Sequence, residues 1–141
     1  MNKSYVGIDV SKDKLDVWCP AWSQPKVYAN TPQGLKALFK ALLKDFSQPP
    51  LHLICEATGG YERLLLQEAF ARNVIISRLN PRPVRDLAKA KGLLAKTDRI
   101  DAQLLSEYGR LLEPEPTPPP RPVSQALSAR VRRREALMRQ L

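Results

Sequence analysis

One run of residues limits the possible folds more than any other feature of the sequence. Residues 51–55, Leu-His-Leu-Ile-Cys, are almost continuously apolar and follow Pro49-Pro50. A strand that is apolar on both faces has to be covered on both faces, as in sheets with helices on each side. The run ends directly on Glu56. The sequence therefore predicts a buried strand with an acid at its carboxyl end.

The segments around this strand predict an alternating order of strands and helices. Residues 11–14 form a polar turn, so the first two strands are expected to form a hairpin. The predicted strands are residues 5–10, 15–19, 27–29, 51–55 and 74–76. Helices are predicted from Pro32, from about Tyr61 and from Pro81, and a fourth, capped by Thr97, ends near Leu112. This order favours a mixed α/β sheet with helices on both faces.

Helical spacing also predicts which side chains face the core. Asn30-Thr31 provides a capping side chain before Pro32, the first residue of its helix. In the fourth helix, the predicted buried stripe consists of Ile100, Leu104, Tyr108, Leu111 and Leu112.

Four acidic residues stand where this fold would bring side chains together. Asp9 stands near the end of the first strand and Glu56 at the end of the buried strand. Asp98 and Asp101 are predicted in the first turn of the fourth helix. Sites in open α/β sheets form at the carboxyl ends of neighbouring strands, and helical residues three apart point the same way. Converging carboxylates repel one another unless they bind protons or cations. The pattern therefore indicates a site for divalent cations such as Mg²⁺, which prefers oxygen ligands.

Structural roles are the alternatives for these and other polar residues. An acid at a strand end can be a cap or a solvated charge, and Asp98 can complement a helix dipole. The dipole role does not explain Glu56, an acid placed at the end of an apolar strand. The acids interpreted as solvated are Asp13, Asp16 and Glu62.

The remaining polar motifs favour structural interpretations. Residues 58–60, Thr-Gly-Gly, lack a P-loop lysine and are interpreted as a strand-to-helix turn rather than a phosphate-binding loop. His52 is interpreted as an ordinary strand residue. Cys19 and Cys55 lie in separate apolar runs and are interpreted as buried free thiols.

The charge of the chain points to a polyanionic partner. Lys and Arg number 23 against 14 Asp and Glu, which gives a formal net charge of +9. The candidate nucleic-acid-binding residues are Lys12, Lys14, Arg78, Arg82, Arg85, Lys89, Lys91, Lys96, Arg99, Arg132, Arg133 and Arg134. No apolar run approaches the ~20 residues that a membrane span needs. We therefore expect a soluble, intracellular protein without a membrane partner.

The carboxyl-terminal third changes character at residue 113. Six prolines fall between residues 114 and 122, which predicts a stiff, extended linker over residues 113–122. Residues 127, 131, 134, 138 and 141 then follow heptad spacing, which predicts that the basic helix over residues 123–141 begins a coiled coil. The expected domains are residues 1–112, the linker, and a helix that continues in a longer protein.

Several of these segments together resemble the amino-terminal domain of IS110-family transposases. The resemblance is carried by residues 7–12 (GIDVSK), 15–17 (LDV), 56–62 (EATGGYE), 80–81 (NP) and 95–102 (AKTDRIDA). It implies a RuvC-like, RNase H-like fold over roughly residues 4–112. It also implies that the family's four acids, known as the DEDD set, are Asp9, Glu56, Asp98 and Asp101.

The resemblance implies an activity, cofactors and partners. The activity is cutting and rejoining of element ends and target DNA, with Mg²⁺, or Mn²⁺ as a substitute, held by the four acids as two ions. Studied relatives use a structured guide RNA, called a bridge RNA, in a prokaryotic cytoplasm. In the family a downstream domain supplies a nucleophilic serine, and a coiled coil supports a homo-oligomer. No residue of this chain is assigned as that serine. The homo-oligomer is expected of the full-length protein, and the 141 residues alone can be a monomer.

Two other functions fit parts of the pattern. Residues 7–9 followed by a hairpin are similar to the phosphate-binding hairpin of actin-like ATPases, although 141 residues cannot supply the second domain that closes over ATP. Alternatively, the chain is a non-catalytic module that binds nucleic acid through its basic residues. Neutralising Asp9 or Glu56 separates a metal-dependent enzyme from such a module.

Overall fold

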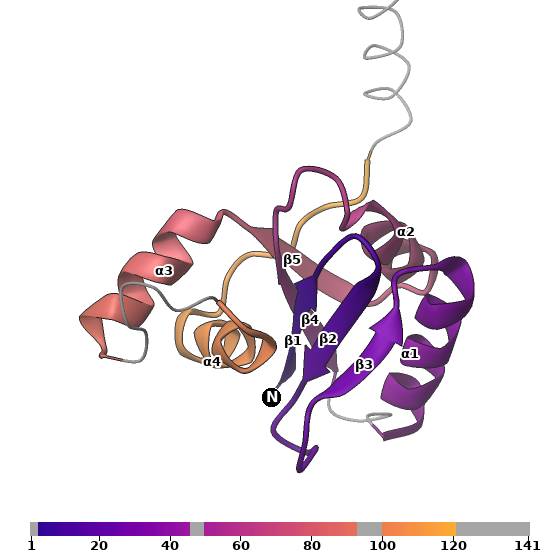
Figure 1. Cartoon of the computed structure of the whole chain (residues 1–141), viewed down its shortest axis with the longest axis horizontal. Helices are drawn as coiled ribbons and strands as arrows, with labels where there is room; N and C mark the ends of the chain where they lie inside the picture. The colour runs from indigo at the N-terminus through magenta and orange to yellow at the C-terminus, as the bar shows by residue number, and fades with distance from the viewer. Residues whose placement is uncertain (1–2, 46–49, 93–99, 121–141) are drawn as a thin grey trace, which may run out of the picture.

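The computed structural model describes residues 3–45, 50–92 and 100–120 as a five-stranded sheet with four helices (Figure 1). The strands are β1 (Ser4–Val10), β2 (Lys14–Trp18), β3 (Lys26–Ala29), β4 (Leu51–Glu56) and β5 (Ile75–Leu79). The helices are α1 (Pro32–Asp45), α2 (Arg63–Ala71), α3 (Pro81–Ala90) and α4 (Ala102–Leu112). In the described segments, no helix is both long enough and apolar enough to cross a membrane.

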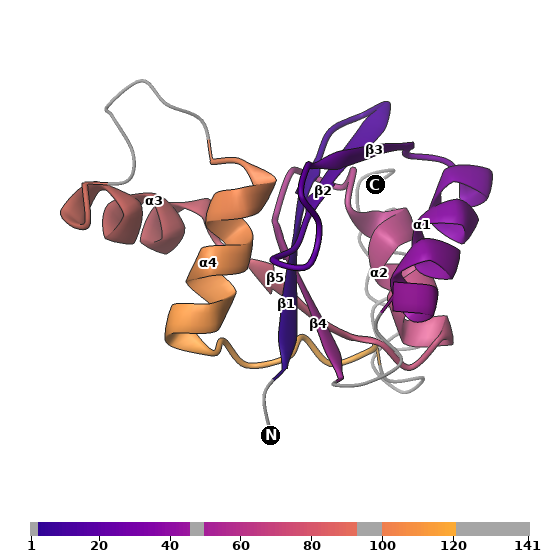
Figure 2. The same cartoon turned by 90° about the horizontal axis from the view of Figure 1, so that it is seen from below.

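The sheet is mixed, as predicted, and has the order β3-β2-β1-β4-β5. β2 pairs antiparallel with β1 and β3, whereas β4 pairs parallel with β1 and β5. Figure 2 shows α1 and α2 on one face of the sheet and α3 and α4 on the other. Every residue of β4 from Leu51 to Cys55 is buried. The prediction of a central strand covered on both faces is therefore confirmed.

Helix α4 lies unusually close to β1, and its buried face differs from the predicted stripe. The buried residues of the helix are Ala102, Leu105, Ser106 and Gly109, while Leu111 and Leu112 are exposed. A Cβ at Gly7 of β1 would overlap the carbonyl of Ala102 and lie 2.7 Å from Ser106 N. The stripe prediction is confirmed for Ile100, which is buried, and for Leu104 and Tyr108, which pack partly buried against the same cluster. It is wrong for Leu111 and Leu112, because it followed large apolar side chains. The packing instead uses small ones, which let the helix backbone approach the strand.

Helix starts follow the predicted chemistry in two places. Asn80 caps α3 by accepting a hydrogen bond from Arg82 N at 3.2 Å, and Pro81 is the first helical residue. At α1, Thr31 is the capping residue, since its Oγ1 accepts from Gly34 N at 3.0 Å. The side chain of Asn30 is therefore available for other contacts.

Part of the Pro-rich segment lies against β5. Thr117 N donates to Ile76 O at 2.8 Å, and Arg78 N donates to Thr117 Oγ1 at 2.9 Å. Residues 113–120 have no helix or strand of their own, as expected, but these bonds fix them to the edge of the sheet. Residues 121–122 of the predicted linker and the predicted coiled-coil segment 123–141 lie outside the described residues.

A buried histidine connects the sheet to this segment. His52 is 1% exposed, and its Nε2 lies 2.7 Å from Ser77 Oγ. Ser77 Oγ donates its own proton to Glu115 O at 2.7 Å. The hydroxyl therefore accepts from the ring, so Nε2 of His52 carries a proton. His52 is indeed a strand residue with a structural role.

His52 makes the stability of the chain depend on pH. Burial, and to a lesser degree the charge of Lys3, lowers its pKa from 6.5 to about 4. The unfolded chain therefore binds this proton more tightly, and the free energy of unfolding should fall by about 3 kcal/mol between pH 6.5 and pH 4. Urea unfolding across this range measures the loss. His52→Gln should flatten this part of the profile, and an unchanged slope in that variant would contradict the assignment.

Candidate carboxylate site

Four strands end at the same edge of the sheet. β1, β4 and β5 are parallel, and β3 runs in their direction because both β1 and β3 are antiparallel to β2. Asp9, Glu56 and Asn80 therefore lie at one edge, together with Asn30 after β3. This is the edge at which α/β sheets form sites.

Asp9 and Glu56 occupy adjoining positions on neighbouring strands. The last paired residues of β1 and β4 are Ile8 and Cys55, so each acid follows directly after this pair. Ile8 and Cys55 pack in the core under α1 and α2, whereas Ile54 packs in the cluster that contains Leu105 of α4. Because strand side chains alternate, both acids belong to the α4 face. Asp9 is 8% exposed and Glu56 is half-buried.

Asp101 approaches this face from the start of α4. The sequence predicts Asp101 in the first turn of the helix, but Asp101 is instead the N-cap. Its Oδ1 accepts from Leu104 N at 2.8 Å. The next residue, Ala102, is the one whose carbonyl lies against Gly7, two residues before Asp9. Asp98 and the predicted cap Thr97 lie outside the described residues.

The described residues at this edge do not form a metal site by themselves. Among residues 3–45, 50–92 and 100–120, no three His, Cys, Asp or Glu side chains gather closely enough to hold an ion. Asp16 of β2 is paired with Asp9 and is half-buried, not simply solvated as predicted. The donors nearby are carboxylate oxygens, which suit hard cations.

The thiols do not contribute to this edge. Cys19 and Cys55 are buried and free, as predicted. Burial, the largest cause, raises the pKa of Cys55 to about 12. Its thiol therefore stays protonated and faces the opposite side of the sheet from Glu56.

The loop after Glu56 is organised by a second acid, Glu62. This residue was predicted to be solvated, which is wrong: it is 3% exposed. Its Oε1 accepts from Thr58 Oγ1 at 2.8 Å, Gly60 N at 3.0 Å and Thr58 N at 3.3 Å. Its Oε2 lies 3.7 Å from Arg78 Nη1. Residues 58–60 therefore form a turn around a carboxylate, and Gly59 and Gly60 adopt positive φ angles.

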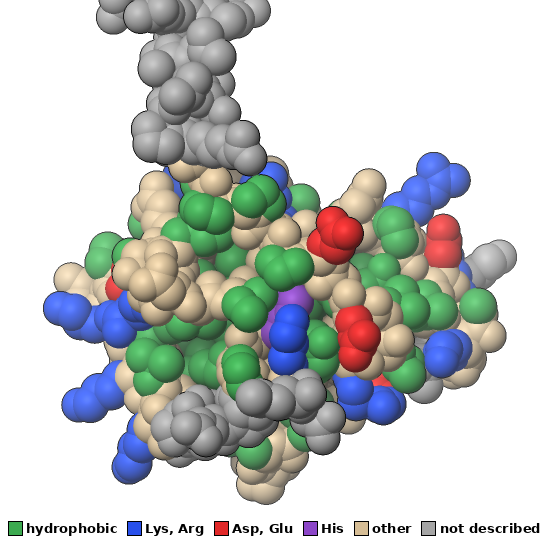
Figure 3. Space-filling model, turned by 180° about the vertical axis from the view of Figure 1, so that it is seen from behind, with side chains coloured by type: hydrophobic (Ala, Val, Ile, Leu, Met, Phe, Trp, Pro, Cys, Tyr) green, Lys and Arg blue, Asp and Glu red, His purple; other side chains and the backbone are tan. Residues whose placement is uncertain are grey.

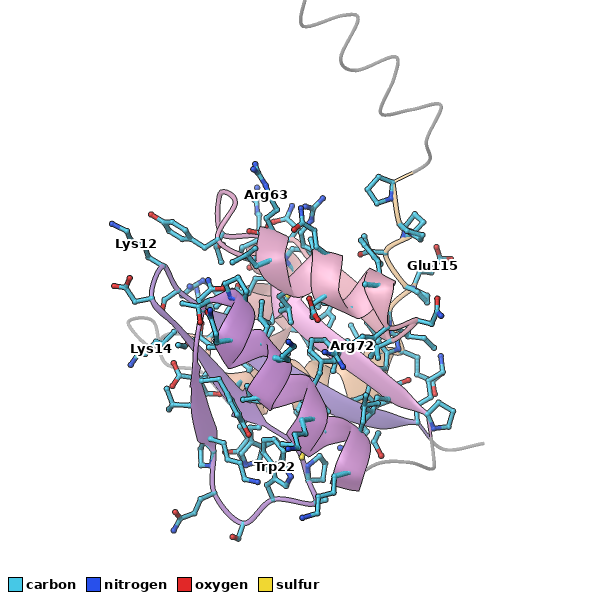
Figure 4. The ribbon with its side chains drawn as sticks, turned by 90° about the vertical axis from the view of Figure 1, so that its right-hand side faces the viewer. Lys12, Lys14, Trp22, Arg63, Arg72 and Glu115 are labelled. Atoms are coloured by element: carbon cyan, nitrogen blue, oxygen red, sulfur yellow. The ribbon has the colours of Figure 1, made fainter. Side chains whose placement is uncertain are left out.

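The predicted basic residues lie on several elements rather than in one patch. Lys12 and Lys14 project from the β1–β2 hairpin, and Arg63 stands at the start of α2 (Figure 4). On the face seen in Figure 3, basic side chains stand mostly at the margins. Arg63 was not among the basic residues predicted from the sequence to bind nucleic acid. The other described residues of the predicted set are Arg78, Arg82, Arg85, Lys89 and Lys91. Those outside the described residues are Lys96, Arg99, Arg132, Arg133 and Arg134.

Comparison with known proteins identifies the family. The family model of IS110-type DEDD transposases, described as "Transposase", matches residues 6–141. This chain belongs to the IS110 transposase family. The resemblance inferred from the sequence motifs is thereby confirmed.

Relatives of this IS110 transposase chain include two proteins named "Pilin gene-inverting protein". The protein from Moraxella bovis is 34% identical over 144 residues, and the one from Moraxella lacunata is 34% identical over 145 residues. Each match includes 100% of this chain and 45% of the relative. The chain thus spans less than half the length of these relatives.

The fold of the transposase chain is also similar to a solved structure, RuvC of T. thermophilus in complex with a Holliday junction substrate. The TM-score is 0.56 at 18% identity, over 82% of this chain and 100% of RuvC. The predicted RuvC-like, RNase H-like fold is therefore confirmed. The chain is therefore a domain of the IS110 transposase family with a RuvC-like fold.

Proposed function

We propose that this chain provides the acid-bearing, metal-dependent part of the site with which an IS110 transposase cuts and rejoins DNA strands. The observation that carries the proposal is the adjoining position of Asp9 and Glu56 at the ends of two parallel strands, on the face covered by α4. Asp101 at the start of α4 is the third proposed catalytic acid. Asp98, outside the described residues, is the fourth.

The donor chemistry fits Mg²⁺, with Mn²⁺ as a substitute. Two such ions would be held by the hard carboxylate oxygens of Asp9, Glu56, Asp98 and Asp101. Such ions, when bound, stabilise charge on a phosphodiester and activate the attacking group. The chain's own contribution is to hold the two strand-end carboxylates close together. Because Asp9 is almost buried, its charge is poorly solvated and favours a cation partner.

DNA is the proposed substrate of this site. Lys12, Lys14 and Arg63 project into solvent from segments at or next to the edge that carries the acids, where they can contact phosphates. The basic residues of α3 extend this surface, and those outside the described segments are proposed to do so as well. A guide RNA and a homo-oligomer are proposed for the whole protein. The part of the relatives' length that this chain does not span is proposed to supply the nucleophilic serine.

Mn²⁺ binding tests the proposed site. Asp9→Asn and Glu56→Gln should each weaken Mn²⁺ binding to the chain by more than about tenfold, because even outer-shell partners of metal ligands contribute this much. Isothermal titration calorimetry measures the affinity. Asp86→Asn makes the same change at an exposed residue of α3 and should leave it unchanged. Wild-type affinity in both site variants would instead favour a basic nucleic-acid-binding module.

A further inference from the structure

Asn30 stands at the carboxyl edge of the sheet but has no role in the helix that follows it. It comes directly after β3, whose end lies at the same edge as the ends of β1 and β4. The capping of α1 is performed by Thr31. The side chain of Asn30 is instead directed toward two other loops.

Both amide protons of Asn30 are used to join these loops. Its Nδ2 donates to Ser11 O at 2.9 Å and to Tyr61 O at 3.0 Å. Because both partners are carbonyl oxygens, only the amide nitrogen can face them. The backbone N–H of Asn30 donates to Asp13 O at 3.0 Å, which anchors the residue to the β1–β2 turn.

The two loops are those that carry the proposed site. Ser11 follows Asp9 by two residues, and Tyr61 follows Glu56 by five. The paired register of β1 and β4 ends at Ile8 and Cys55, before both acids. Asn30 therefore joins the chain segments at the point where strand pairing no longer does.

Hydrogen bonds fix the short segment between Glu56 and Tyr61. Residues 58–60 are bonded to the carboxylate of Glu62, and Ala57 N donates to Leu79 O at 2.9 Å. A contact at Tyr61 is thus transmitted to the end of β4. The cost of the arrangement is visible in Asn30 itself, because its Oδ1 is buried without a hydrogen-bond partner among the described residues.

We propose that Asn30 is a positioning residue that holds the loops after Asp9 and Glu56 together and so sets the spacing of the two carboxylates. The inference rests on the proposed function of these acids. Two close carboxylates repel each other, and their separation grows unless the surrounding structure resists. The Asn30 amide supplies this resistance before a cation is bound, and it touches neither cation nor substrate.

Asn30→Ala tests this role, with Thr31→Ala as the matched control. Thr31→Ala removes one hydrogen bond at the neighbouring residue, the cap of α1, but leaves the loop contacts intact. Hydrogen–deuterium exchange of the metal-free chain and calorimetry with Mn²⁺ are the two measurements. In Asn30→Ala, amides of residues 11–13 and 58–62 should exchange about tenfold faster, and Mn²⁺ affinity should fall about tenfold. In Thr31→Ala, the exchange rates and the Mn²⁺ affinity should both stay within about twofold of wild type, although the urea midpoint should shift about as much as in Asn30→Ala.

The outcomes separate this inference from the proposed function. The positioning role is overturned if Asn30→Ala leaves hydrogen exchange unchanged, or if it speeds exchange but keeps wild-type Mn²⁺ affinity. In either case, loss of Mn²⁺ binding in Asp9→Asn would still support the proposed site. Wild-type affinity in Asp9→Asn and Glu56→Gln, or no Mn²⁺ binding by the wild-type chain, overturns the proposed function and the inference with it. If Asn30→Ala does not fold, Asn30→Ser keeps one donor and should show the same two effects at smaller size.

Discussion

Gly7→Ala should destabilise the chain by about 3 kcal/mol, near the upper end of the usual cost of an overpacked core. The new methyl group would overlap the Ala102 carbonyl and lie 2.7 Å from Ser106 N, so the backbone of α4 has to move. The move would also stretch the bond from Ser106 Oγ to Tyr5 O, which is 2.6 Å long. The urea midpoint measures the loss.

The same substitution should also reduce Mn²⁺ binding, since the displaced end of α4 is the end that carries Asp101. Ala29→Val serves as the control, because it adds carbon atoms to a strand at an exposed position. It should leave both stability and Mn²⁺ affinity nearly unchanged. A midpoint for Gly7→Ala within the error of wild type would show that α4 does not depend on close contact with β1.

The close contact of α4 with β1 also explains where sequence reasoning failed. Leu111 and Leu112 have the spacing and size of core residues, yet they are exposed, while Ser106 and Gly109 are buried. Apolar periodicity detects the side chains that fill space. It does not detect a face selected for being small, because serine and glycine carry no hydrophobic signal.

The strand-end acids were predictable for a physical reason. Asp9 is the last residue but one of β1 and Glu56 is the last residue of β4, and the apolar runs before them define both the strands and their carboxyl ends. Parallel pairing then brings the two ends together without further information. For Asp101 the sequence correctly predicted a place near a helix start. The predicted cap was Thr97, four residues earlier, whereas Asp101 itself caps α4.

The hydrogen bonds that support the site could not be predicted in the same way. Asn30 reaches Tyr61, 31 residues away, and Arg78 lies beside Glu62. Such contacts depend on how loops from separate strands meet. From sequence, an Asn before a helix predicts a cap and a Glu near a helix start predicts a solvated charge. Only the tertiary fold reveals that both residues bind loop backbone.

Glu62→Leu should destabilise the chain by about 3 kcal/mol, because a buried carboxylate is lost and each hydrogen bond to a charged group contributes about 1.5–3 kcal/mol. The substitution leaves Thr58 N, Thr58 Oγ1 and Gly60 N without their common acceptor. It also leaves Arg78 without its carboxylate partner. Urea unfolding at pH 7 measures the loss. Glu68→Leu, which removes only the partly exposed ion pair with Arg72 on the same helix, should cost less than about 1 kcal/mol.

Acid titration provides an independent check of Glu62. Burial opposes its ionisation, but hydrogen bonds from its own backbone, from Thr58 and from Gly60 outweigh burial and lower the pKa from 4.5. A lowered pKa in the folded state means that the stabilisation is complete above pH 4.5 and disappears as the pH falls through the lowered value. This window lies below that of His52, whose effect falls between pH 6.5 and about 4. Wild type should therefore lose stability further below pH 4.5, and Glu62→Leu should lack this second loss. If both lose stability in parallel there, the Glu62 carboxylate is not what holds the loop.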